Sequence, residues 1–165
     1  MHKKILCLLF LLLSASALQA QEVYNFVLES AQRTINNPAS GDTQVNIAQF
    51  KNTALVYLKN QAFAHQEEVS EDFLNTQAYY MSEFVTLFFS EVVEVQKKGK
   101  KVMEKTMLLF MEASLTHPLF PDTDEETTLC YVNDPASLTR FSLNTDWEKA
   151  YEAAKAELKT GKHKK

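Results

Sequence analysis

The sequence has few of the residues that make tight turns or covalent cross-links. It contains three Gly and four Pro in 165 residues, too few for the many turns of an all-β fold. Its two Cys residues cannot form the framework of a disulfide-stabilised domain, so a hydrophobic core must hold the fold together. The composition, 45% hydrophobic and 23% charged, is that of one ordinary globular domain.

The chain also lacks the motifs of the common catalytic and cofactor-binding sites. It contains no Gly-rich nucleotide-binding run, no Cys-x-x-Cys-His haem motif and no Gly-x-Ser-x-Gly nucleophile elbow. His65, His117 and His163 do not form the i, i+3 or i, i+4 pairs that are typical of transition-metal sites. We therefore expect a protein that is not an enzyme and has no cofactor or metal.

The first twenty residues have the layout of a secretory signal peptide. Lys3 and Lys4 form a short positive segment, residues 5–13 are an unbroken apolar run, and residues 14–20 are mainly small and polar. The apolar run is well short of the roughly 20 residues that span a bilayer, and no other stretch is long and apolar enough. The pattern predicts export with cleavage after Ala20 or, at a competing site, after Ala17.

The destination that we expect is a bacterial periplasm or the exterior of the cell. No Asn-x-Ser/Thr acceptor is present, which favours a bacterial over a eukaryotic secretory route. Removing Lys3 and Lys4 lowers the 17 basic residues to 15 against 21 acidic ones, a mature net charge of about −6. Such a chain repels nucleic acid, so no nucleic-acid partner is expected. Residues 160–165 are Lys-rich and predict a disordered basic tail.

Helical periodicity dominates the mature chain. Apolar residues recur every three to four positions in segments that cover approximately residues 22–36, 43–66, 71–98 and 101–115. A last helix follows the capping box formed by Thr145 and Glu148 and ends near Lys159. Segment 71–98 is apolar nearly all round, which predicts a central position, and its short link to 101–115 predicts antiparallel packing. We expect an all-α bundle of four to five helices, a single domain over residues 21–159.

The stretch before the last helix differs from the rest and predicts an irregular or β-like segment. It carries an acidic cluster of Asp122, Asp124 and Glu126, which alternate as calcium ligands do in a helix-loop-helix site. That template also requires Gly and Glu at positions where this chain has Thr127 and Asn133. We interpret the cluster as a solvated loop, with an irregular calcium site as the alternative. We expect the stretch to be anchored on the bundle by four apolar residues: Leu119, Phe120, Tyr131 and Phe141.

Removal of the predicted signal peptide, which contains Cys7, would leave Cys130 as the one remaining cysteine. It lies within a short apolar alternation, where a lone Cys is usually a small core residue. An intermolecular disulfide and a catalytic thiolate are the alternatives, and the second would require His65 or His117 beside Cys130 or beside the acidic loop in an open cleft.

The helix over residues 43–66 has two apolar faces. Its main stripe faces one way, while Val45, Val56 and Phe63 cluster on the opposite side at 100° per residue. That second face is either buried under the C-terminal segment or available to a partner. The Phe and Met residues of segments 71–98 and 101–115 form either an ordinary core or an apolar cavity.

The chain resembles the small exported all-α proteins of unknown function that are common in Gram-negative bacteria. The resemblance rests on a signal that ends Leu18-Gln19-Ala20-Gln21 and on the overall composition. It implies no catalytic residue, ligand or reaction. From the residues themselves we expect a non-enzymatic binding module of the envelope with an unknown protein partner. The alternative is a periplasmic carrier of a hydrophobic small molecule, held in the Phe/Met-rich core of the bundle.

Overall fold

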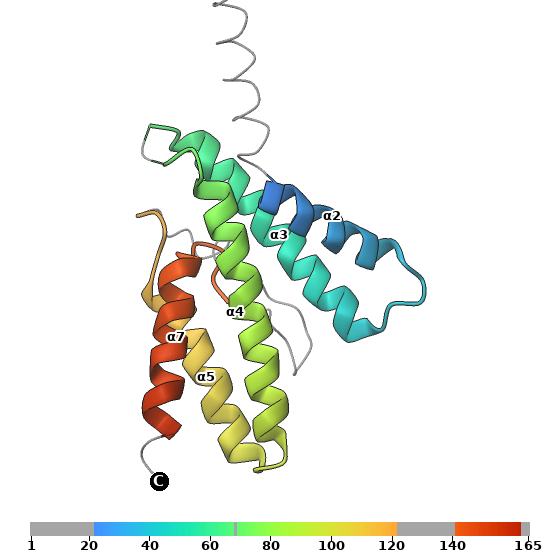
Figure 1. Ribbon diagram of the computed structural model, residues 1–165, viewed down its shortest axis with the longest axis vertical. Coiled ribbons are helices and arrows are strands. Elements are labelled where there is room, and N and C mark those ends of the chain that lie inside the picture. Colours follow the sequence, from blue (N-terminus) through green and yellow to red (C-terminus); the bar gives the residue numbers. More distant parts are fainter. Residues whose placement is uncertain (1–21, 68, 122–140, 163–165) are drawn as a thin grey trace, which may run out of the picture.

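Five α-helices make up the part of the chain that the structure describes, which comprises residues 22–67, 69–121 and 141–162 of a computed structural model (Figure 1). The helices are α2 (Glu22–Asn36), α3 (Asp42–Ala64), α4 (Phe73–Gln96), α5 (Lys100–Thr116) and α7 (Trp147–Lys162). The prediction of an all-α bundle is confirmed, and each helix ends within three residues of its expected position. Helix α7 continues through Lys162, into the segment that was predicted to be a disordered tail.

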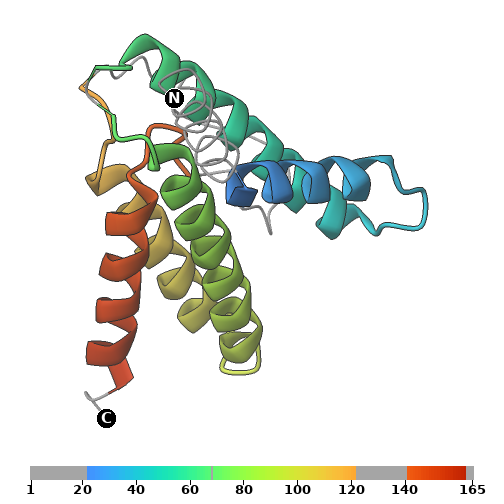
Figure 2. The same cartoon turned by 45° about the horizontal axis from the view of Figure 1, so that its top comes forward.

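Helix α4 occupies the central position that its apolar circumference predicts. It packs against each of the other four helices of the described residues. On one side it forms a three-helix unit with α5 and α7, and on the other it meets the antiparallel pair of α2 and α3. Figures 1 and 2 show this α2–α3 hairpin extending away from the bundle, so that much of its length projects beyond α4.

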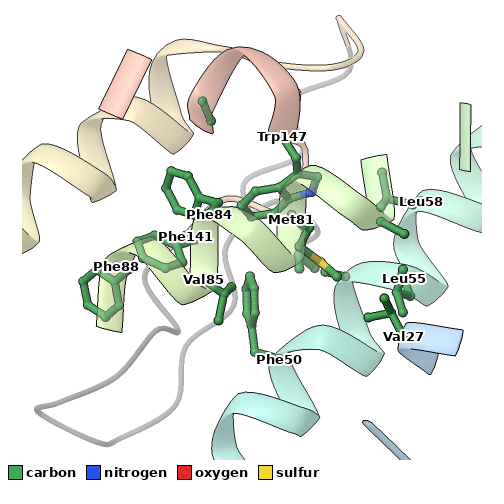
Figure 3. Close-up of a cluster of buried hydrophobic side chains, with 14 of the residues drawn as sticks. Val27, Phe50, Leu55, Leu58, Met81, Phe84, Val85, Phe88, Phe141 and Trp147 are labelled. Atoms are coloured by element: carbon green, nitrogen blue, oxygen red, sulfur yellow. The ribbon is translucent and has the colours of Figure 1, made fainter. Parts of the chain in front are cut away.

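A cluster of aromatic side chains fills the space where the hairpin, the bundle and the segment before α7 meet (Figure 3). The ring of Phe84 on α4 is edge-to-face with the rings of Phe141 and Trp147, at centroid distances of 5.1 and 5.5 Å. Phe50 of α3 contacts the same two rings, each at 5.9 Å. Such geometries place positive ring edges against negative ring faces, so the cluster gains more than area burial alone.

The turn between α4 and α5 depends on one glycine. Gly99 has a φ of 101°, a region that side chains with a Cβ rarely adopt. It ends the link that reverses the chain, and α4 and α5 then pack together, as the short connection predicts.

The start of α7 differs from the predicted capping box. The cap is Asp146, whose carboxylate accepts a hydrogen bond from the backbone N–H of Lys149 at 3.3 Å. Thr145 is fully buried, and its one hydroxyl proton is shared between the carbonyls of Ser114 and Ser142. The prediction was one residue too early because the buried Thr145 hydroxyl is used by the carbonyls of Ser114 and Ser142, which leaves the capping role to Asp146.

The segment before α7 is held to the stretch that follows α5 by a pair of side-chain hydrogen bonds. The amide of Asn144 accepts from the backbone N–H of Phe120 at 2.9 Å and donates to the carbonyl of the same residue at 2.8 Å. Phe120 and Phe141 are buried and Leu119 is half-buried, so these three predicted anchors lie against the bundle. Tyr131 lies outside the described residues. The predicted β-like segment is not confirmed, and most of it is also outside them.

Candidate functional site

The second apolar face of α3 lies on the surface of the protein. The side chains of Val56 and Phe63 are 47% and 82% exposed, while Val45, nearer the start of the helix, is half-buried. The opposite face of the same helix is closed, since Phe50 and Leu58 are almost completely buried. Helix α3 therefore uses one apolar face for the core and leaves Val56 and Phe63 in water.

These two side chains are close enough to be covered together. They are seven residues apart on one helix, which corresponds to two turns and about 10 Å along the axis. Polar residues flank them, with Lys59 exposed between them on the same face. We call Val56 and Phe63 the α3 surface pair. Phe63 stands out because a Phe side chain with so little cover is unusual in a helix that also supplies core residues.

A hollow of about 560 Å³ opens between α2 and α3, on a different side of α3 from the surface pair. Its apolar wall includes Phe26 and Val27 of α2 and Ile47 of α3, and Ser82 of α4 lines it as well. Among the described residues that line it, Lys51 is the one cation. A second hollow, of about 400 Å³, lies between α5 and α7 beside Leu108 and His117. Sequence reasoning predicted neither, because each depends on how two helices diverge.

Burial changes the electrostatics of Lys51. Removal from water lowers the pKa of its amine below the ordinary value of 10.5, and the nearby Glu83 carboxylate partly opposes that shift. Within the described residues no carboxylate comes within ion-pair distance of the Lys51 amine. The hollow therefore contains a partly desolvated cation that no carboxylate of the described residues neutralises by direct contact.

The other candidate sites that the sequence predicts either lie outside the described residues or have their residues in separate places. Asp122, Asp124, Glu126 and Cys130 lie outside the described residues, and so do their calcium-binding, disulfide and catalytic alternatives. The ring of His65 stacks on Phe120 at a centroid distance of 4.5 Å, and His117 accepts a hydrogen bond through its backbone carbonyl from Asp146. Among the described residues, no three His, Cys, Asp or Glu side chains are close enough to hold a metal ion.

Two buried amides on α4 are structural residues that the sequence analysis did not single out. Asn75 and Gln77 are 8% and 5% exposed, in the first two turns of a helix with an otherwise largely apolar interior. Their position among apolar residues is a signal that the sequence carries, because a buried amide side chain usually hydrogen-bonds a backbone group. Their partners, however, belong to α2 and α7, which no local pattern connects to α4.

No family model, curated protein or solved structure matches this chain. None of the helices in the described part is long and apolar enough to cross a membrane.

Proposed function

We propose that the protein is an exported, non-enzymatic binding module of the bacterial envelope that docks a protein partner on the α3 surface pair. The observation that carries the proposal is the exposure of Val56 and Phe63. Had the chain covered these side chains, α3 would have had no unpartnered apolar face. The signal-like segment over residues 1–20 supports the export part of the proposal.

On binding a partner, the α3 surface pair would bury a small apolar area surrounded by polar residues. Full burial of a Val or Phe side chain contributes about 1.5–3 kcal/mol, so the pair is sufficient for a hot spot within a larger interface. Lys59 between them adds a charged residue that a partner with an acidic side chain can match.

The carrier alternative draws less support from the packing. Neither hollow is lined by a Phe or Met side chain of α4 or α5. The Phe84 ring instead lies edge-to-face against Phe110, Phe141 and Trp147. The binding module is therefore the function that we favour.

Quantitative co-purification from the native host tests the proposal. Envelope proteins that associate with the wild type are compared with those that associate with a V56S/F63S double variant. The control is Val93→Ser, because Val93 is also strongly exposed, at 62%, but lies on α4. We expect at least one protein to be retained by the wild type and the control and lost from the double variant. Identical protein sets for all three would contradict the proposal.

A further inference from the structure

The hollow between α2 and α3 has the dimensions of a small-molecule site. Its volume of about 560 Å³ falls within the range of roughly 300–1,000 Å³ that such sites occupy. The projecting part of the hairpin in Figures 1 and 2 explains the opening, because α4 supports only one end of the two helices. One side of the hollow is apolar, with Phe26, Val27 and Ile47 available for contact with hydrocarbon.

Ser82 places a hydrogen-bonding group without a partner at this hollow. Its Oγ atom is buried and has no hydrogen-bond partner. Five other Ser and Thr hydroxyls on α4 and α5 differ, since each donates to a backbone carbonyl three or four residues earlier: Thr86, Ser90, Thr106, Ser114 and Thr116. A buried hydroxyl left unpaired costs free energy. A change of χ1 rotamer that brought the Ser82 hydroxyl to an acceptor in the hollow would remove that cost.

The other buried polar side-chain atom without a partner in the described residues is Trp147 Nε1. It belongs to the closed aromatic cluster and lines neither hollow. Of these two residues, Ser82 is the one that lines a hollow.

Lys51 supplies the matching charge. Its amine is partly desolvated and without an ion-pair partner among the described residues, so an anion placed in the hollow gains a charge-assisted hydrogen bond. Glu83, adjacent to Ser82 in α4, is the charged group that influences Lys51. Its negative charge opposes a second negative charge placed beside Lys51. A single carboxylate fits this balance better than a phosphate with two charges.

We propose that the hollow between α2 and α3 binds a medium-chain monocarboxylate, with the carboxylate on Lys51 and Ser82 and the hydrocarbon chain on Phe26, Val27 and Ile47. The proposal is independent of the α3 surface pair, because Val56 lies about 140° around the helix from Lys51. Lys51 and Ser82 line the same hollow, and neither has a side-chain partner among the described residues, so a carboxylate supplies an acceptor for both, while the apolar wall accounts for the hydrocarbon chain.

Isothermal titration of the purified exported protein with decanoate tests this site. The wild type is expected to bind one decanoate per chain, and Lys51→Met to weaken binding by about 10- to 100-fold, the loss of one charge-assisted hydrogen bond. Ser82→Ala is expected to weaken it by about 2- to 10-fold. Butyrate should bind at least about 10-fold more weakly than decanoate, because it leaves the apolar wall uncovered.

Lys59→Met is the matched control, since it removes an exposed lysine from another face of α3. It is expected to bind decanoate like the wild type, and Lys51→Arg to retain most of the affinity because the charge remains. Thermal unfolding of each variant verifies that the hairpin is intact. Absence of saturable decanoate binding by the wild type up to about 1 mM would overturn the proposal. So would a folded Lys51→Met protein with wild-type affinity, or an equal loss in Lys59→Met.

Discussion

Asn75 and Gln77, two residues apart on α4, each hold the first turn of a different helix. The side-chain oxygen of Asn75 accepts a hydrogen bond from the backbone N–H of Tyr24 in α2, at 3.1 Å. That of Gln77 accepts from the backbone N–H of Trp147 in α7, at 2.8 Å. The first backbone donors of a helix have no partner within it, so each amide satisfies a group that burial would otherwise penalise. Helix α4 thereby sets the position of both the hairpin and the bundle.

Replacement of Gln77 by Ala is expected to destabilise the protein by about 1–3 kcal/mol. It removes the bond to the Trp147 N–H and a second bond, at 3.3 Å, from the Gln77 amide to the Asp146 carboxylate. Urea unfolding followed by the fluorescence of Trp147, the one tryptophan of the chain, measures the loss. Gln96→Ala, an exposed change at the end of the same helix, should shift the free energy of unfolding by less than about 0.5 kcal/mol. Equal effects of the two variants would contradict the capping role.

The Asp146 carboxylate makes stability depend on pH. Burial acts to raise its pKa, but hydrogen bonds from the side chain and backbone of Lys149 and from Gln77 outweigh burial and hold the pKa below the ordinary value of 3.8. The folded state therefore binds the proton less tightly than the unfolded chain. The contribution to stability is complete above the unfolded pKa and is lost as pH falls through the folded pKa.

Asp146→Asn is expected to lower the free energy of unfolding at pH 7 by removing the ion pair with Lys149, whose Nζ–Oδ2 distance is 2.8 Å. The gap between wild type and variant should narrow below about pH 4, as the wild-type carboxylate is protonated. Asp42→Asn, which removes an exposed carboxylate at the start of α3, serves as the matched variant. A gap between wild type and Asp146→Asn that stays constant to about pH 2 would show that this carboxylate does not carry the effect.

Phe84→Leu and Phe63→Leu should differ sharply although the chemical change is the same. Phe84 is fully buried and its ring contacts three aromatic neighbours, so its loss leaves a cavity and removes edge-to-face contacts, at a cost of about 1–3 kcal/mol. Phe63 is 82% exposed, so its replacement should change the free energy of unfolding by less than about 0.5 kcal/mol. Chemical denaturation compares them directly, and a comparable loss from Phe63→Leu would mean that its ring is covered in solution.

The intact mass of the protein tests the prediction that residues 1–20 are a signal peptide. Cleavage after Ala20 leaves Gln21 as the first residue, immediately before α2 begins at Glu22, and cleavage after Ala17 leaves Leu18. Intact-mass measurement of protein from the periplasm or medium should match one of these two termini. An intact protein that begins at Met1 and stays in the cytoplasm would contradict export.

Local patterns were sufficient to predict the helices, because each has an apolar stripe or a breaker at its end. The central position of α4 followed from its apolar circumference. Long-range relations were beyond that reasoning. The hydrogen bonds of Asn75 and Gln77 span 51 and 70 residues, and Thr145 was misassigned because its burial depends on the end of α5.

For the candidate sites, too, the sequence predicts the local pattern but not the long-range packing. Periodicity placed Val56 and Phe63 on a face separate from the core stripe, but only the packed structure shows that no other element of the described residues covers them. The hollow could not be predicted, because Lys51 and Ser82 come from helices whose spacing depends on the hairpin's angle to α4.

Photocrosslinking in living cells of the native host tests the central proposal most directly. A photoreactive phenylalanine analogue placed at position 63 should give a discrete crosslinked species in the envelope fraction, and that species should disappear when Val56→Asp is added. The same analogue at position 93, an exposed site on α4, should not give that species. A crosslinked partner from position 63 that depends on Val56 is the result that we predict. No specific product from position 63, or the same products from both positions, would contradict a binding module that acts through α3.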